Sequence, residues 1–394
     1  MRIFQIGTDR LPCNSKFGGA IETYVYNISK ELAERGLKVH VITLGNKDEI
    51  FEENGLIFHS FSLDRSMGKI LAKISSFVSS SNRNIIYVSY KILNILNRIR
   101  KTYGDIDVIH SHYFTTSLAP LLYKSLYDNS VKLVLHWHNE PKSNWINKFV
   151  AKRYDVVAAV SNYVKIAIIQ RLGINKVKVA YNAIDTNFFR FNEAWRAEVR
   201  ENLGFSKDDF VLLFVGRIVK EKGLHHLLKA LHEIARYGKD KIKAIIVGPR
   251  GHFDREENSQ YTIFIEKLLQ NLRNQVFYLG KIPREELVKV YCASDAVVVP
   301  SIFPDPCPSV ILEAMSCNRP IIAYNVGGIP ELIRDTEPIF LVNSCKPSDL
   351  AKAIIELHDN INRDTLYANL RSIVEKRFSI KTIVDSLMDL YQAR

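Results

Sequence analysis

The sequence predicts an α/β protein of two Rossmann-like domains that face each other across a cleft, and three observations support this fold class. Its 394 residues exceed what one ordinary hydrophobic core organises, so two domains of roughly 180–200 residues are expected. Short β-branched runs alternate with amphipathic helical stretches along the chain, which is typical of parallel sheets covered by helices. Uninterrupted apolar runs such as Val211–Val215 indicate strands that are buried on both faces.

The N-terminal half opens on an expected strand, Arg2–Ile6, and a helix over Ile21–Arg35. Further strands are expected at Lys38–Leu44, Asp107–His110, Lys132–His136, Val156–Val160 and Val177–Ala180. The alternation pauses over Asn182–Asn192, so we expect one domain over 1–183 and a second over 184–378. The last helix, about Ser379–Gln392, is able to pack on either domain, which makes residues 379–394 a candidate addition to the first.

The C-terminal half repeats the scheme, with the same alternation of strands and helices. Its expected strands are Phe210–Val215, Lys243–Val247, Val276–Leu279, Ala296–Val299 and Pro320–Tyr324. Open parallel sheets bind ligands at the carboxyl ends of their strands. Functional residues are therefore expected in the loops just after strands.

Composition excludes several classes of protein. No apolar run reaches the roughly 20 residues that span a bilayer, and the N-terminus lacks the apolar stretch and cleavage site of a signal peptide. The five cysteines are scattered without a CxxC, which argues against a disulfide framework or a zinc knuckle. Reduced thiols in the cytoplasm are the expected state.

The formal charge of +12 is concentrated in one half of the chain. Residues 1–185 hold 25 Lys and Arg against 15 Asp and Glu, whereas the remainder holds 29 against 27. This asymmetry indicates that the first half meets an anionic partner.

Gly18-Gly19-Ala20 follows the first expected strand and opens a helix. Glycines let the backbone approach a ligand, and a helix N-terminus offers free N–H groups to a phosphate or sugar oxygen. The motif is not a GxGxxG, so a tight strand-to-helix turn without a ligand explains it equally well.

Two cations, Arg217 and Lys222, stand in the loop after the apolar strand Phe210–Val215. A short glycine-containing loop can aim both at a diphosphate, Arg as a fork and Lys as a point charge. A solvated basic loop is the alternative.

The segment from Val299 to Met315 carries the strongest pattern, because a strand, a proline-rich loop and a helix that begins near Pro308 follow one another. The N–H groups of Ser309 and Val310 would lead that helix, with its dipole behind them, and suit a diphosphate. Asp305 lies before the helix and Glu313 inside it, so one carboxylate can reach a sugar hydroxyl and the other ribose hydroxyls. A capping Asp and a surface Glu are the alternative.

These motifs together resemble the retaining glycosyltransferases of the GT-B fold, group 1 or family 4. The resemblance rests on Gly216-Arg217 and Lys222-Gly223, on two acids in a Pro-Ser…Leu-Glu-Ala-Met context, and on Gly327-Gly328-Ile329-Pro330-Glu331. Asn182-Ala183-Ile184-Asp185 resembles the interdomain segment of that family, and Gly18-Gly19 resembles its N-terminal loop. The matches run in the expected order from about position 18 to 331.

The resemblance implies a role for each matching residue. Arg217 and Lys222 would hold the donor diphosphate, with the Ser309 and Val310 amides beside it. Glu313 would bind ribose, Asp305 would face the sugar, and Gly19 would approach the phosphate or sugar. In two places the sequence departs from the family: the first acid is Asp305 where Glu is usual, and Cys307-Pro308 replaces Phe-Gly. Both departures bear on the identity of the sugar.

Two HxH pairs, His110-Ser111-His112 and His136-Trp137-His138, lie at the ends of expected strands. The resemblance implies that His138 contacts the transferred sugar. A metal site is a second reading, because HxH presents two imidazoles together, although no Asp, Glu or Cys is arranged to complete it. Hydrogen-bonded histidines at strand ends are the third. We assign His138 to the substrate, assign no metal ligand and leave the other three open.

From Arg65 to Gly104 eight Lys and Arg occur with no acidic residue. The helical spacing of Ile92, Ile95, Leu96 and Ile99 gives an apolar stripe beside these cations, as in a helix that lies on an anionic bilayer. A core-facing stripe with a solvated basic face is the alternative. No nucleic-acid-binding module is recognised, so nucleic acid is not expected as a partner.

The sequence therefore predicts a metal-independent retaining transferase that moves a sugar from a nucleotide diphosphate sugar to a glycan or lipid-linked acceptor and needs no further cofactor. Its first domain would bind the acceptor at the cytoplasmic face of an anionic membrane. Three rivals remain: an epimerase or phosphorylase of the same fold, a metal-dependent hydrolase built on the HxH pairs, and a binding protein that does not consume the nucleotide sugar.

Overall fold

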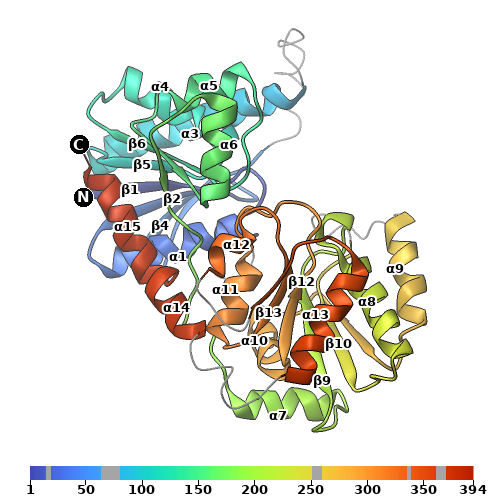
Figure 1. Cartoon of the computed structure of the whole chain (residues 1–394). Helices are drawn as coiled ribbons and strands as arrows, with labels where there is room; N and C mark the ends of the chain where they lie inside the picture. Colours follow the sequence, from blue (N-terminus) through green and yellow to red (C-terminus); the bar gives the residue numbers. More distant parts are fainter. Residues whose placement is uncertain (15–18, 64–79, 251–259, 335–338, 361–369, 394) are drawn as a thin grey trace. The chain divides into compact units, whose positions relative to one another are not determined.

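A computed structural model describes residues 1–14, 19–63, 80–250, 260–334, 339–360 and 370–393 (Figure 1). The chain forms two compact units, Met1–Ala183 with Ile380–Arg394, and Ile184–Ser379. Each unit contains a twisted, largely parallel sheet covered by helices, which confirms the predicted fold class. Predicted Gly18 lies outside the described residues.

The first unit is built on an eight-stranded sheet in the order β3-β4-β2-β1-β5-β6-β7-β8. The strands are β1 (Arg2–Ile6), β2 (Lys38–Leu44), β3 (Glu49–Glu53), β4 (Leu56–Phe61), β5 (Val108–Ser111), β6 (Lys132–Trp137), β7 (Val156–Ala159) and β8 (Val177–Val179). All neighbours pair in parallel except β3, which is antiparallel to β4 at the edge. Because the strands are parallel, residues that follow β1, β5 and β6 emerge at the same edge of the sheet.

Helices cover both faces of this sheet. They are α1 (Ala20–Glu34), α3 (Ser80–Tyr103), α4 (Leu118–Leu126), α5 (Trp145–Ala151), α6 (Asn162–Leu172) and α15 (Ile380–Gln392), with the 3-10 turn η1 (Phe114–Thr116). The connections through α3, α4, α5 and α6 all advance in the direction from β4 to β8, whereas α1 leads the opposite way, from β1 to β2. Right-handed crossovers therefore place α3 to α6 on one face, and α1, which packs against α15, on the other (Figure 1).

The apolar stripe of α3 faces the core. Ile92 and Leu96 are fully buried, and Ile95 and Ile99 are buried to at least nine-tenths. These four residues therefore do not form a membrane-facing stripe, and the core-facing alternative is correct for them. The reason is the crossover position of α3, which needs an apolar side to cover the sheet between β4 and β5.

Helix α15 completes the core of the first unit, although it ends the chain. Ile383 and Leu387 pack in one cluster with Val25 and Ile28 of α1. Arg35 at the end of α1 donates to the Asp385 carboxylate at 2.5 Å. The last residues therefore belong to the same compact unit as the first.

The second unit is built on a six-stranded parallel sheet in the order β11-β10-β9-β12-β13-β14. Its strands are β9 (Phe210–Val215), β10 (Ile242–Val247), β11 (Val276–Gly280), β12 (Ala296–Val299), β13 (Ile321–Tyr324) and β14 (Ile339–Val342). Its helices are α7 (Glu193–Asn202), α8 (Leu224–Arg236), α9 (Gln260–Gln270), α10 (Arg284–Ala293), α11 (Ser309–Ser316), α12 (Ile329–Leu332), α13 (Pro347–Asn360) and α14 (Leu370–Arg377), with the 3-10 turn η2 (Lys220–Lys222). Central strand β12 is buried throughout and β9 is buried from Phe210 to Phe214, as their apolar sequences predicted.

None of the helices within the described ranges combines the length and the apolar character that crossing a bilayer requires.

Candidate active site

Lys222 and Asp305 form an ion pair at the carboxyl edge of the second unit's sheet. Lys222 ends η2, in the loop after β9, and Asp305 lies in the loop after β12. The Lys222 ammonium donates to the Asp305 carboxylate, and both side chains are partly exposed. The structure thus joins two of the predicted donor-binding residues, which lie 83 positions apart in the sequence.

Glycine allows these two loops to approach each other. Gly223 has a φ of +72°, and a Cβ at this position would collide with the Pro300 carbonyl oxygen. The amide of Ile302 donates to the Glu221 carbonyl at 3.0 Å, which ties the loops together. The side chain of Lys222 is therefore positioned by a backbone contact that only glycine permits.

A third loop closes on Asp305 from β13. Gly327 has a φ of +60°, and a Cβ there would lie 2.5 Å from the Asp305 carbonyl oxygen. That carbonyl accepts a hydrogen bond of 2.8 Å from the amide of Gly328. Loops after three neighbouring strands of the sheet, β9, β12 and β13, therefore meet at Asp305.

Helix α11 begins where the sequence predicted, with Pro308 as its N-cap residue and Ser309 as its first helical residue. The N–H groups that lead a helix have no acceptor within it, so those of Ser309 and Val310 are available to a ligand. Both residues are partly exposed. With Lys222 and the positive end of the helix dipole, they form an arrangement suited to an anion.

Glu313 is held in place by Tyr291 of α10. The Tyr291 hydroxyl donates to Glu313 Oε2 at 2.7 Å. Burial raises the pKa of the Glu313 carboxyl, while the Tyr291 hydrogen bond, the Arg284 charge and the Ser309 side chain act to lower it. The carboxylate is thus a preorganised acceptor for hydroxyl groups. Tyr291 was not predicted, because nothing in the sequence links α10 to α11.

Arg217 lies in the same loop as Lys222 and is partly buried. The amide of Val219 donates to its carbonyl at 2.9 Å, and the next residue, Ile218, pairs with Arg250. The backbone of the loop is therefore fixed from both sides of Arg217. The role of its guanidinium toward a diphosphate stays a prediction.

In the first unit, Gly19 is the N-cap residue of α1. A Cβ at Gly19 would lie 2.7 Å from Glu22 Oε2, and the same carboxylate accepts a hydrogen bond from the buried Thr8 hydroxyl. A larger residue here would therefore require the buried Glu22 carboxylate to shift. Approach of Gly19 to a ligand stays a prediction.

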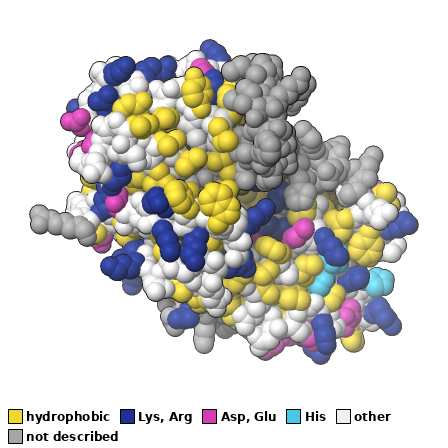
Figure 2. All heavy atoms as spheres, turned by 90° about the horizontal axis from the view of Figure 1, so that it is seen from above, with side chains coloured by type: hydrophobic (Ala, Val, Ile, Leu, Met, Phe, Trp, Pro, Cys, Tyr) yellow, Lys and Arg dark blue, Asp and Glu magenta, His cyan; other side chains and the backbone are white. Residues whose placement is uncertain are grey.

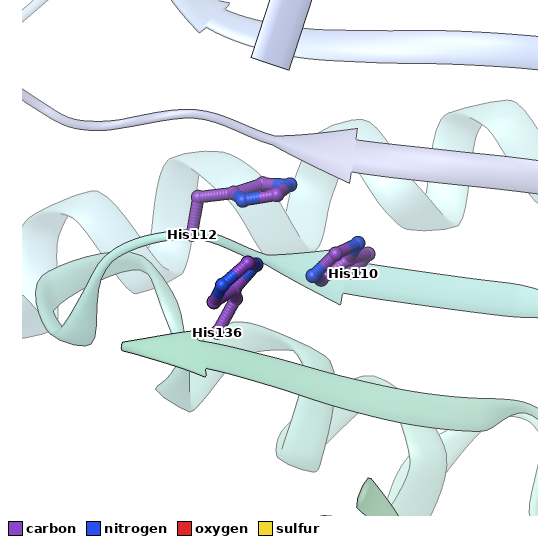
Figure 3. A group of neighbouring side chains, drawn as sticks. All are labelled: His110, His112 and His136. Carbon is purple, nitrogen blue, oxygen red and sulfur yellow. The ribbon is translucent and has the colours of Figure 1, made fainter. Parts of the chain in front are cut away.

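His110, His112, His136 and His138 form one buried group at the ends of β5 and β6, and Figure 3 shows the first three of them. His110 Nδ1 lies 2.7 Å from the Tyr391 hydroxyl of α15, and His112 Nε2 lies 2.7 Å from Gln5 Oε1. His112 Nδ1 lies 3.2 Å from His138 Nε2, and His136 Nε2 lies 3.0 Å from the Ala180 carbonyl.

These hydrogen bonds assign the histidine tautomers. The Gln5 amide donates to Tyr391 at 3.0 Å, so the Tyr391 hydroxyl donates to His110 Nδ1 and the His110 hydrogen lies on Nε2. Gln5 Oε1 accepts from His112 Nε2, so His112 Nδ1 accepts from His138 Nε2. One directed series of hydrogen bonds thus runs from His138 through His112, Gln5 and Tyr391 to His110.

The four imidazoles are neutral at physiological pH. Burial lowers the pKa of His136 to about 4 and lowers the pKa values of His110, His112 and His138 well below their ordinary value. The other histidines act in the same direction on His110, His112 and His138. Contact with the Asn182 side chain partly opposes this effect at His138.

His110, His112 and His136 bring nitrogen atoms within 4.8 Å of one another, as a metal site requires. However, both nitrogens of His112 are hydrogen-bonded, and His110 Nε2 carries a hydrogen in the tautomer assigned above. His110 Nε2 is a buried donor without a hydrogen-bond partner, and His136 Nδ1 is a buried acceptor without one. Metal binding through His110 Nε2 would therefore require the proton on this nitrogen to move.

His138 itself is buried rather than open to solvent, with 8% of its surface exposed. It follows β6 directly and packs against the ring of Tyr24, with centroids 5.2 Å apart. Contact with a sugar stays a prediction for this residue. Sequence analysis missed its link to Gln5 and Tyr391, because no local pattern predicts a series that joins positions 5, 112 and 391.

Comparison with known proteins identifies the family. A model described as glycosyl transferases group 1 matches residues 196–373, and one described as Glycosyltransferase Family 4 matches residues 17–188. The chain is 29% identical over 221 residues to the uncharacterized glycosyltransferase MJ1607 of Methanocaldococcus jannaschii, a match that covers 55% of this chain and 54% of that protein. It is 29% identical over 304 residues to the putative glycosyltransferase YtcC of Bacillus subtilis, covering 74% of this chain and 73% of that one.

The fold is similar to that of Anabaena Alr3699/HepE, solved in complex with UDP and glucose. The two structures match over 100% of both chains, with a TM-score of 0.76 and 21% sequence identity. The two family models divide the chain as the two units do, one matching within each α/β fold. The family match and the shared fold lead to one conclusion: this chain belongs to the group 1 glycosyltransferases.

Proposed function

We propose that this glycosyltransferase takes its sugar from a nucleotide diphosphate sugar that binds mainly to the second unit. The observation that carries the proposal is the placement of Lys222 beside Asp305, which lies in the loop that leads into α11 and its first amides. A departing diphosphate gains negative charge as the glycosidic bond breaks. An ammonium and a helix N-terminus are the groups that stabilise such charge without a metal.

Each site residue takes one role in the proposal. Arg217 and Lys222 bind the diphosphate together with the amides of Ser309 and Val310. Glu313, oriented by Tyr291, accepts hydrogen bonds from the ribose hydroxyls. Asp305 accepts from a hydroxyl of the transferred sugar.

The proposed reaction retains the configuration of the anomeric carbon. The bond between that carbon and the phosphate oxygen breaks, and the acceptor oxygen forms its bond on the same face of the sugar. The acceptor proton passes to the departing phosphate oxygen, so no protein nucleophile is needed. His138, neutral because of its burial, contacts the sugar as a hydrogen-bonding group rather than as a charged acid.

A uridine nucleotide is the first donor to test, because the structurally similar Alr3699/HepE was solved with UDP and glucose. For the acceptor we propose a glycan or a lipid-linked glycan used in cell-surface assembly, met at the cytoplasmic face of the membrane. The net charge of the first 185 residues supports an anionic surface there, since 25 basic residues stand against 15 acidic ones.

A thermal-shift panel of nucleotides and nucleotide sugars tests the donor site. Ligand at a hundred times its Kd stabilises the folded state by about 2.7 kcal/mol, so a true donor raises the Tm and its nucleotide diphosphate does so too. If no nucleotide raises the Tm of the wild-type protein but a sugar acceptor does, the assignment of the second unit to the donor is wrong.

Product analysis separates the proposal from its rivals of the same fold. A transferase releases nucleotide diphosphate faster when acceptor is present, and the sugar appears on the acceptor. An epimerase changes the sugar without releasing it, a phosphorylase needs inorganic phosphate, and a binding protein consumes nothing. Activity that survives a chelator, with no metal bound to the purified protein, excludes the hydrolase based on the HxH pairs.

A further inference from the structure

The two helical faces of the first unit differ in their charge. The helices of one face, α3, α4, α5 and α6, contain no Asp or Glu. The opposite face is formed by α1 and α15, which contain Glu22, Glu31, Glu34, Asp385 and Asp389. One face of the sheet is therefore covered by helices that carry no negative side chain.

Each helix of the acid-free face carries positive charge. Where side chains are described, its Lys and Arg are Lys91, Arg98, Arg100 and Lys101 on α3, Lys124 on α4, Lys148 on α5, and Lys165 and Arg171 on α6. Three of them have an acidic partner outside these helices: Lys91 with Asp48, Lys124 with Asp155, and Arg171 with Glu140. The remaining cations give this side of the unit a positive electrostatic potential that extends into the solvent.

The same face exposes large apolar side chains. They are Ile86 and Tyr90 on α3, Leu122 and Leu126 on α4, Trp145 and Phe149 on α5, and Ile166 on α6. No residue of α1 or α15 is among the exposed large hydrophobics of the described residues. Figure 2 shows hydrophobic side chains gathered on this side of the molecule, with Lys and Arg among and around them.

Helix α5 carries exposed cations and exposed aromatic side chains close together. Trp145, Lys148, Phe149 and Lys152 recur at helical spacing, and all four are exposed. Trp145 is 75% exposed, the highest exposure among the large hydrophobics of the described residues. The Asn144 side chain caps this helix by accepting from the Asn147 amide at 2.8 Å, so its orientation is fixed.

We propose that the outer face of α3 to α6, called the basic face below, is a docking surface for an anionic lipid bilayer. Trp145 and Phe149 enter the headgroup region, where amphipathic and aromatic side chains are most stable. The cations around them bind the lipid phosphates. The inference rests on the proposed function in one respect, because a lipid-linked acceptor would explain why the enzyme binds a membrane. The physical evidence for the binding is the basic face alone.

Several observations favour a bilayer over other anionic or apolar partners. The exposed apolar residues are spread over four helices that also carry Lys and Arg, so this face offers apolar and cationic contacts together, as binding to an anionic lipid surface requires. Two positively charged faces repel each other, so a second copy of this chain is disfavoured. A lipid surface is fluid and adapts to scattered anchors.

Sedimentation with lipid vesicles tests the proposal. The full-length protein is mixed with vesicles of phosphatidylcholine alone, or with about a third phosphatidylglycerol, and wild type is expected to bind only the second kind, less strongly as salt rises. The double variants Trp145→Ser/Phe149→Ser and Lys148→Glu/Lys152→Glu are each expected to weaken binding by about tenfold or more.

The matched control lies on the opposite face of the same sheet. Lys30→Glu on α1 and Lys381→Glu on α15, both at exposed positions, change the net charge by the same amount as the lysine pair above. Tyr237→Ser replaces an aromatic residue of similar exposure, 67%, in the second unit. Both controls are expected to bind anionic vesicles as wild type does. Unchanged thermal unfolding of every variant excludes misfolding as the cause.

Three outcomes overturn the proposal. The first is that wild type does not bind anionic vesicles, and the second is that the basic-face and control variants lose vesicle binding equally. The third is that vesicle binding is absent while a stable dimer or RNA complex forms and is abolished by Trp145→Ser/Phe149→Ser. None of these affects donor binding in the second unit. A variant that fails to bind vesicles but still shows the nucleotide-induced rise in Tm leaves the proposed transferase intact. Loss of that rise in wild type would instead count against the transferase.

Discussion

The hydroxyl of Tyr391 lies 2.7 Å from Nδ1 of His110, so a residue from the end of the chain fixes the tautomer of a histidine in the first unit's sheet. The same hydroxyl accepts from the Gln5 amide at 3.0 Å. All three side chains are buried, and each depends on the others for its hydrogen bonds.

Tyr391→Phe is expected to lower the free energy of unfolding by about 1–3 kcal/mol, because it leaves the Gln5 amide and His110 Nδ1 buried without this partner. Denaturant unfolding measures the change. Tyr237→Phe, at a position that is 67% exposed, serves as the control and should cost little. Equal stability of the two variants would show that the Tyr391 hydroxyl is not structurally important.

Lys222→Ala is expected to lower kcat by roughly a hundredfold or more, because the charge that develops on the leaving diphosphate loses its cation. Turnover of the nucleotide sugar identified by the thermal-shift panel provides the measurement. Lys220→Ala removes an equal charge from the same turn at an exposed position and should leave kcat within a few-fold of wild type. Near-normal turnover of Lys222→Ala would remove this residue from the mechanism.

Glu313→Gln is expected to weaken nucleotide binding by about tenfold, because a charged acceptor for ribose hydroxyls becomes a neutral one. Isothermal titration with the nucleotide diphosphate gives the Kd. Tyr291→Phe, which removes the donor at 2.7 Å from Glu313 Oε2, should weaken binding in the same direction by a smaller factor. Unaltered affinity in both variants would place the ribose elsewhere.

Gly223→Ala and Gly238→Ala provide a matched comparison within the second unit. Both glycines have positive φ, +72° and +70°, so both alanines pay a conformational cost of about 1 kcal/mol. Only Gly223 also meets a backbone atom, the Pro300 carbonyl oxygen, whereas Gly238 faces open space. Gly223→Ala should therefore destabilise the protein more and also reduce turnover, since it displaces Lys222. Equal losses in the two variants would contradict the close approach of the loops.

Stability is expected to fall as the pH drops from about 6.5 toward 4. Burial lowers the pKa of His136 and of His40 to about 4 and that of His59 to about 3, below the value of an unfolded chain. The unfolded state therefore binds more protons in this range, and each such histidine removes about 1.4 kcal/mol per pH unit. Urea midpoints measured at pH 7.5 and 5 test this. A midpoint that stays constant or rises at pH 5 would contradict the neutral, buried state.

Much of the fold was predictable because parallel strands buried on both faces leave a clear apolar signal. The central strands β1, β2, β9 and β12 have the predicted limits. Strands β3 and β4 were not predicted, and β3 gives a weak signal because it is an edge strand without a buried residue and pairs antiparallel to β4. A signal was present in Asn54-Gly55, whose φ values of 51° and 75° form the tight hairpin turn that this dipeptide favours.

The candidate site was predictable to the extent that its residues follow strands closely. Lys222 and Asp305 lie in the loops after β9 and β12, which are neighbours in the sheet, so strand order brings them together. Tyr291 and Tyr391 reach the site residues from other helices, over separations of 22 and 281 positions. Contacts of this kind depend on tertiary packing and leave no periodic trace in a single sequence.

Helix α15 gives the molecule an unusual order of assembly. A ribosome delivers the chain from its N-terminus, yet the first unit needs Ile383, Leu387 and Tyr391, which are made after the whole of the second unit. The second unit, Ile184–Ser379, is complete in the nascent chain before the first can close. The unit encoded first therefore completes its core after the second unit has been made, and its α1 surface stays uncovered until α15 has left the ribosome.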